Sequence, residues 1–117
     1  DEQDLAAIGC PGPVDERVAR LAELATSAGL DGVVCSPQEA RLLRMRLGPG
    51  PVLVTPGVRP AETASGDQKR TMTPSQAIAA GADHLVVGRP ITAAADPQAA
   101  LSAILAAMSA TPDAIRN

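Results

Sequence analysis

A short segment that joins a helix to a strand occurs twice in this chain, and it limits the folds that the chain can adopt. Residues 28–34 (AGLDGVV) and 80–86 (AGADHLV) share a glycine after a helix, a two-residue link and an apolar run. The apolar residues of each run are consecutive rather than alternating, which predicts strands buried on both faces, as in a parallel sheet covered by helices. Strand–helix units in series form either a doubly wound sheet or a (β/α)8 barrel.

Local signals predict the remaining elements. We expect a helical turn near residues 4–8, helices over residues 14–28, 37–47, 74–81 and 97–108, and strands that begin at Val33, Val52 and Leu85. Ser36 and Thr73 each open a capping box that is followed by proline at the first helical position. Three strand–helix units are too few for either fold, because such a sheet leaves two edges unpaired and one apolar face open to water. We therefore expect an incomplete domain.

Composition narrows the classes of function. A chain of 117 residues with 45% hydrophobic and 20% charged residues is typical of at most one soluble, globular domain. The net charge of −3 and the absence of Phe, Tyr and Trp argue against nucleic acid as a partner. No apolar run is long enough to span a membrane, so we expect a cytoplasmic protein without a membrane partner. Cys10 and Cys35 are predicted to be free thiols.

Two strand ends carry the residues that suggest a binding site. Pro56 and Arg59 follow the second strand, and Gly88 and Arg89 follow the third. The loop after the second strand holds about 14 residues more than the preceding loop and adds Gln68; such extra length is often functional. Glycine lets a backbone approach a ligand closely, and the guanidinium fork suits a phosphate. These residues predict a phosphate-binding corner, the alternative being that both arginines are solvated surface charges.

Five motifs make the chain resemble a known family. They are VTPGVRP at 54–60, GDQKR at 66–70, TP at 73–74, AGAD at 80–83 and VGRPI at 87–91. Together they closely resemble orotidine 5'-phosphate decarboxylase of the bacterial type, and the resemblance covers essentially the whole chain as the C-terminal half of that enzyme. It implies an α/β fold, the (β/α)8 TIM barrel. Residues 1–117 would supply its last three strand–helix units, as the C-terminal part of a single domain that is not complete alone.

The resemblance also implies an activity and a binding site. Members are lyases that decarboxylate orotidine 5'-monophosphate to UMP in de novo pyrimidine biosynthesis, without metal or cofactor, and are usually homodimers. The substrate phosphate is assigned to Arg59, Gln68, Arg89 and the backbone N–H groups of Gly88 and Arg89. Pro56 would lie beside the pyrimidine, and the loop over residues 58–73 would close over the substrate.

The catalytic group of the family is absent from this chain. Members carry an Asp-x-Lys-x-x-Asp motif on their third strand, whereas the only lysine here is Lys69 in the polar loop, with Met72 at the place of the second aspartate. His84 begins a strand, at the end opposite the site. We therefore expect no catalytic residue here and expect the N-terminal half of the same barrel as a partner. The alternative is a non-catalytic, phosphate-binding half-barrel fragment that self-associates through its open edges.

Overall fold

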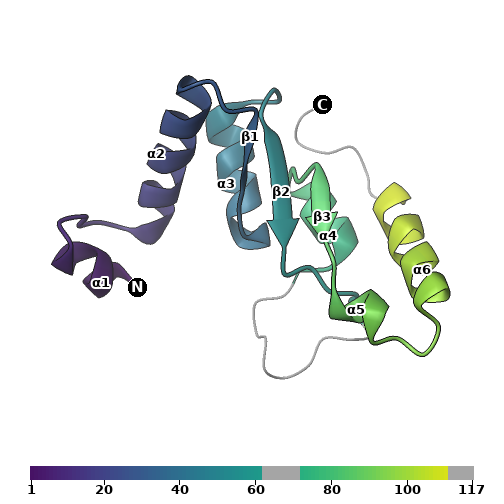
Figure 1. The fold of residues 1–117 in the computed structure, drawn as a ribbon. Coiled ribbons are helices and arrows are strands. Elements are labelled where there is room, and N and C mark those ends of the chain that lie inside the picture. The colour runs from purple at the N-terminus through teal and green to yellow at the C-terminus, as the bar shows by residue number, and fades with distance from the viewer. Residues whose placement is uncertain (62–71, 111–117) are drawn as a thin grey trace.

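Three parallel strands form the centre of the molecule (Figure 1). The computed structural model describes residues 1–61 and 72–110. The strands are β1 (Gly32–Val34), β2 (Val52–Pro56) and β3 (His84–Val86), in the spatial order β1-β2-β3. Val34 pairs with Val54, and Pro56 pairs with Val86, so the carboxyl ends of β2 and β3 lie next to each other. The parallel sheet predicted from the two similar segments is confirmed.

Helices connect the strands, with α3 and α4 on one face of the sheet (Figure 1). Their bounds are α1 (Glu2–Ala7), α2 (Val14–Ser27), α3 (Pro37–Leu47), α4 (Pro74–Ala79), α5 (Arg89–Thr92) and α6 (Pro97–Ser109). The helix predicted over residues 37–47 has the predicted bounds, and the other long helices begin at the predicted residues. The short helix α5 was not predicted from the sequence.

Capping residues fix the helix starts that the sequence predicted. At α3, the backbone N–H of Ser36 donates to Glu39 Oε2 at 3.1 Å. At α4, the Gln76 N–H donates to Thr73 Oγ1 at 3.2 Å, and Gln76 Oε1 accepts from the Thr73 N–H at 3.0 Å. These bonds satisfy backbone N–H groups at the start of each helix. Both boxes therefore hold the chain where it turns from the carboxyl edge of the sheet into a helix.

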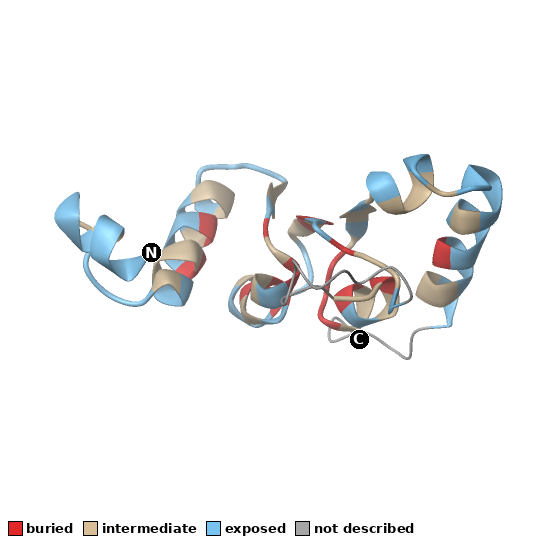
Figure 2. Cartoon of the chain, turned by 90° about the horizontal axis from the view of Figure 1, so that it is seen from below, coloured by how far each residue is buried: buried red, intermediate tan, exposed pale blue. Residues whose placement is uncertain are grey.

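The core lies between the sheet and its covering helices (Figure 2). Leu53 of β2 and Leu43 of α3 are almost fully buried, and Ala19 and Ala40 let α2 and α3 approach closely. A second cluster joins Val58, Ala77 and Ala82 around the start of α4. Each Å² of apolar surface removed from water contributes about 25 cal/mol of stability. The helix-covered face is therefore the main source of stability.

The opposite face of the sheet is open. Val34 and Val86 are 71% and 53% exposed, although each lies in a strand. Within the described residues, β1 and β3 each pair on one side only. The radius of gyration is 15.6 Å, whereas a compact domain of this length has about 13 Å. The chain alone thus leaves uncovered the apolar surface that strands of this composition normally bury. This agrees with the expectation that three strand–helix units form an incomplete domain.

The larger apolar residues of α2 are only partly buried. Val14 and Val18 are half-buried, but Leu21 and Leu24 are 66% and 67% exposed. The residues that meet α3 are instead Ala19 and Ala22. Small side chains allow the two helices to pack closely, and the larger leucines then project beside that contact.

Arg44 of α3 is a buried cation whose importance the sequence did not reveal. Its guanidinium donates to the carbonyl oxygens of Gly48, Pro51 and Gly81 at 2.8–3.1 Å and forms an ion pair with Asp83. Gly81 has φ +116°, and a Cβ there would lie 2.8 Å from Arg44 Cβ, so this position requires glycine. Asp83 stands in the link between α4 and β3, and its carboxylate is the partner of this buried charge.

Candidate functional site

The carboxyl ends of β2 and β3 bring the expected binding residues to one edge of the sheet. Pro56 is the last residue of β2 and pairs with Val86, the last residue of β3. The segments that follow, 57–59 and 87–89, therefore leave the sheet side by side. Leu53 and Thr55 of β2 face the helices. Because successive side chains of a strand point to opposite faces, Pro56 belongs to the open face, where it is exposed.

A tight turn directs the chain after β2. Gly57 has φ +77°, a conformation that other residues rarely adopt, and it turns the chain out of the strand. Val58 is then buried and forms a parallel bridge with Met72. The Arg59 N–H donates to the Met72 carbonyl at 3.0 Å, which fixes the backbone of Arg59, while its side chain is half-exposed.

The chain after β3 turns directly into a helix. The Gly88 carbonyl accepts from the N–H groups of Ile91 and Thr92 at 2.9 and 3.0 Å, so Gly88 caps α5. The first N–H groups of a helix have no acceptor inside it. That of Arg89 therefore lies at the strand end, followed by Pro90, which has no N–H, and both Gly88 and Arg89 are exposed.

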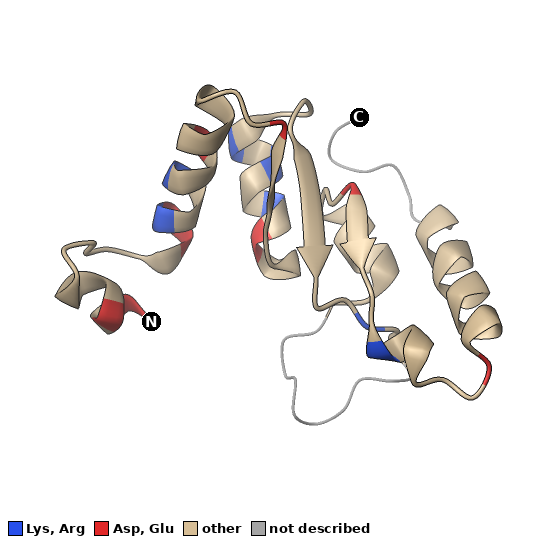
Figure 3. Ribbon diagram, viewed as in Figure 1, with Lys and Arg blue, Asp and Glu red and all other residues tan. Residues whose placement is uncertain are grey.

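The charges at this edge are positive. Arg59 and Arg89 are the two basic residues in the described part of the chain after position 52, and their segments lie beyond the arrowheads of β2 and β3 (Figure 3). Asp83 lies at the opposite end of β3, where it pairs with Arg44. The arrangement can bind an anion through two guanidinium groups. It offers no carboxylate, thiol or imidazole in these two described segments that could transfer a proton.

One described residue of interest lies away from this edge. His84 is exposed at the first residue of β3, at the end of the sheet away from Arg59 and Arg89. Gln68, predicted to add an amide donor to the phosphate site, lies outside the described residues, as does Lys69.

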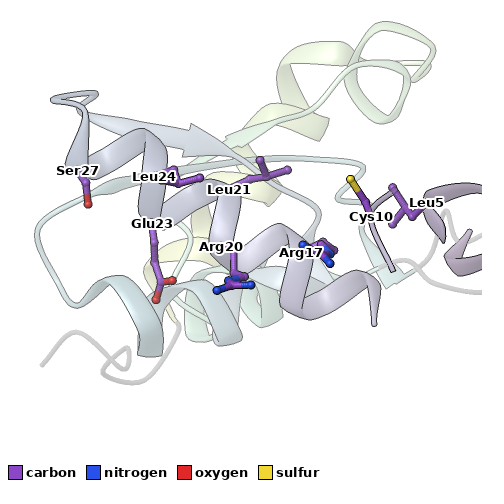
Figure 4. A pocket seen from close by; sticks show the side chains of 8 residues that line it. All are labelled: Leu5, Cys10, Arg17, Arg20, Leu21, Glu23, Leu24 and Ser27. Carbon is purple, nitrogen blue, oxygen red and sulfur yellow. The ribbon is translucent and has the colours of Figure 1, made fainter. Parts of the chain in front are cut away.

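A cavity of about 490 Å³ lies between α1 and α2, far from this edge along the sequence (Figure 4). Leu5, Cys10, Leu21 and Leu24 contribute apolar groups to it, and Arg17 anchors the preceding loop by donating to the Pro11 carbonyl. In residues 1–61 and 72–110, no cluster of three or more His, Cys, Asp or Glu is arranged for a metal ion. No described helix has the length and apolarity to cross a membrane.

Comparison with known proteins decides the family. Residues 1–104 match the model of the "Orotidine 5'-phosphate decarboxylase / HUMPS family". The chain belongs to the orotidine 5'-phosphate decarboxylase / HUMPS family. A curated orotidine 5'-phosphate decarboxylase from Halorhodospira halophila is 60% identical over 110 residues, which cover 94% of this chain and 47% of that protein. One from Thermobifida fusca is 55% identical and covers 95% of this chain and 48% of that protein.

Solved structures of the family support the same assignment. The orotidine 5'-phosphate decarboxylase of Lactobacillus acidophilus matches with a TM-score of 0.78 and 40% identity, over 94% of this chain and 45% of that chain. The enzyme of Pyrococcus horikoshii OT3 matches with a TM-score of 0.65 and 27% identity, over 88% and 47%. The chain thus carries part of a TIM barrel and spans about half the length of the family members that it matches. The predicted family and fold are confirmed.

Proposed function

We propose that this chain forms the phosphate-binding side of an orotidine 5'-monophosphate decarboxylase, a lyase that forms UMP in de novo pyrimidine biosynthesis. The observation that carries the proposal is the juxtaposition of Arg59 and Arg89 at the ends of two paired strands. TIM-barrel enzymes bind phosphate at this edge, in the loops after the last two strands. The names of the curated relatives support orotidine 5'-monophosphate as the substrate.

The roles of the residues follow from their chemistry. Two guanidinium groups present planar forks of donors to the phosphate oxygens, and the N–H groups of Gly88 and Arg89 add neutral donors at the start of α5. Gln68 would contribute an amide from the loop that closes over the substrate. Pro56, exposed on the open face, would lie beside the pyrimidine.

The groups that act on the carboxylate must come from outside this chain. A phosphate-binding corner can orient the remote end of a substrate, and that binding energy can be used to hold the reactive state. It cannot stabilise negative charge that develops at the pyrimidine C6 atom. We propose that residues 1–117 are the C-terminal part of one barrel domain and that the N-terminal half supplies the catalytic lysine and aspartates. The assembled barrel would act as a cytoplasmic homodimer.

Binding of UMP and uridine tests the phosphate assignment. The chain is mixed with the part of the H. halophila relative that lies outside the matched region, which we call the complement. Because only UMP carries a phosphate, Arg89→Ala should reduce its affinity advantage over uridine by about 30-fold or more. The affinity for uridine itself should change little.

Arg41→Ala is the matched control, since Arg41 is exposed on α3 outside both strand-end segments. It should leave the preference for UMP intact in a calorimetric titration. An unchanged preference for UMP in Arg89→Ala would contradict the phosphate assignment. A mixture that binds UMP normally but never decarboxylates the substrate would favour the alternative of a non-catalytic phosphate-binding fragment.

A further inference from the structure

The register of β2 with β3 decides whether Arg59 and Arg89 lie side by side. In the described part of the chain, the two strands pair at three positions. Residues 85–87 of β3 and its end are consecutively apolar, so no alternating pattern selects one register of this short ladder. A slip of two residues would keep each side chain on its face and move one strand by about 7 Å along the other. The register therefore needs a specific contact to hold it.

Asp83, the residue before β3, makes two bonds to a single residue of β2. Its backbone N–H donates to the Leu53 carbonyl at 2.9 Å, and its carboxylate oxygen Oδ2 accepts the Leu53 N–H at 2.9 Å. In a regular parallel ladder, a backbone carbonyl of the neighbouring strand accepts such an N–H. Here the carboxylate takes that place, so both polar backbone groups of Leu53 are bonded to Asp83. A slip of β3 in either direction would break both bonds.

Arg44 holds this carboxylate in the position that the contact requires. Its Nη2 lies 2.6 Å from Asp83 Oδ2, and its other donor bonds reach the carbonyl oxygens of Gly48, Pro51 and Gly81. Pro51 precedes β2, and Gly81 lies in the link before β3, so one guanidinium connects the starts of both strands. The side chains of Arg44 and Asp83 are 1% and 9% exposed, so water hardly competes for these bonds.

We propose that Asp83 is a positioning residue for the phosphate site, although it lies at the opposite end of β3. By setting the register of β3 against β2, it sets where Arg89 stands relative to Arg59. It contacts no substrate atom and acts through the two strands. Bidentate binding of phosphate depends on the geometry of the donors, and a displacement of about 1 Å is costly at such a site. This inference rests on the proposed function and names the residue that aligns its two guanidinium groups.

Two substitutions of Asp83 separate its charge from the position of its acceptor oxygen. Asp83→Asn keeps an oxygen in place for the Leu53 N–H but removes the charge that pairs with Arg44. Asp83→Glu keeps the charge, whereas its additional methylene displaces the acceptor from the Leu53 N–H. We expect Asp83→Asn to destabilise the complex with the complement but to retain its preference for UMP over uridine. Asp83→Glu should reduce that preference about tenfold or more in a calorimetric titration.

Leu43→Ala is the matched control for a loss of stability without a change of register. Leu43 is 1% exposed on α3, and truncation of a buried leucine destabilises about as much as the loss of a buried charge partner. Its apolar side chain takes no part in the bonds of Asp83. The variant should therefore keep the preference for UMP. A loss of preference as large as that of Asp83→Glu would show that any destabilisation suffices and would overturn the proposal.

Nuclear Overhauser contacts between Thr55 and Leu85, which are paired in the sheet, report the register without any nucleotide. In the labelled chain bound to the complement, Asp83→Asn and Leu43→Ala should retain these contacts, and Asp83→Glu should lose them. A folded Asp83→Glu complex that keeps both the contacts and the preference for UMP would overturn the proposal. Loss of that preference in Asp83→Asn would overturn it equally, and this result decides if the Asp83→Glu chain does not assemble.

The outcomes distinguish this inference from the proposed function. An unmodified complex without any preference for UMP would refute the proposed function, and with it the positioning role of Asp83. A complex whose preference for UMP is lost in Arg89→Ala but kept in a folded Asp83→Glu variant would refute the positioning role alone. Loss of the preference in Arg89→Ala and Asp83→Glu, with retention in Asp83→Asn and Leu43→Ala, is the result that both proposals predict.

Discussion

Nη2 of Arg44 lies 2.6 Å from Oδ2 of Asp83, and this buried ion pair joins α3 to the start of β3. The same carboxylate oxygen accepts the Leu53 N–H at 2.9 Å, which ties β3 to β2 as well. Burial lowers the pKa of the Arg44 guanidinium from its ordinary value. That value is so high that the group remains charged at neutral pH. The pair therefore holds three elements in register, at the edge of the sheet opposite Arg59 and Arg89.

Removal of Arg44 should strongly destabilise the fold. Arg44→Met removes the cation that pairs with Asp83 and donates to three carbonyl oxygens, and breaking one partner of a buried pair costs about 3–5 kcal/mol. The free energy of unfolding, measured by urea titration of the complex with the complement, should fall accordingly. Arg46→Met is the control, because Arg46 pairs with Glu16 and Glu23 on the surface and should matter little. Equal effects of the two substitutions would contradict the role given to Arg44.

Thr55 offers a stabilising substitution. Its Oγ1 is fully buried and has no hydrogen-bond partner in the part of the chain that the structure describes. Thr55→Val keeps the shape and removes a desolvated hydroxyl, so the free energy of unfolding should rise by about 1 kcal/mol. Thr55→Ser keeps the hydroxyl but loses a methyl group and should destabilise. A clear loss of stability in Thr55→Val, seen in the same urea titration, would mean that the hydroxyl has a partner in solution.

The two thiols should differ in reactivity. Cys35 is buried between β1 and α3, and burial raises its pKa to about 11, whereas Cys10 is half-exposed in the loop before α2. The thiolate is the reactive form, so at pH 8 iodoacetamide should modify Cys10 and leave Cys35 unmodified in folded protein. The pKa of Cys35 is higher in the folded than in the unfolded chain. The stability that comes from keeping this thiol protonated is therefore lost only as the pH rises toward 11. Mass spectrometry that finds Cys35 modified as fast as Cys10 would show that the core is not formed.

Most helices and strands were predicted from local sequence signals. The features that were not predicted depend on contacts between residues far apart in the sequence. Ser36 and Thr73 were predicted as helix caps because their partners lie three residues away. Arg44 and Asp83 lie far apart in sequence, so no periodicity or spacing relates them. The exposure of Leu21 also depends on a long-range contact, because packing against α3 determines which face of α2 is buried.

The candidate site was predictable to the extent that it depends on strand order. Arg59 and Arg89 each follow an apolar run, and parallel neighbours place such residues at one edge. The segments that carry them lie side by side because of the register of β2 with β3, which the sequence alone did not specify. Gln68 depends on the position of a long loop and remains a prediction.

Decarboxylation by the separate and mixed chains tests the central claim most directly. Residues 1–117 and the complement are purified from a host strain that lacks its own decarboxylase, and loss of orotidine 5'-monophosphate is followed for each alone and for the mixture. Under the proposed function, the phosphate corner lies in one polypeptide and the catalytic lysine in the other, so activity should appear only on mixing. Substantial turnover by residues 1–117 alone would contradict the assignment of catalysis to the other half.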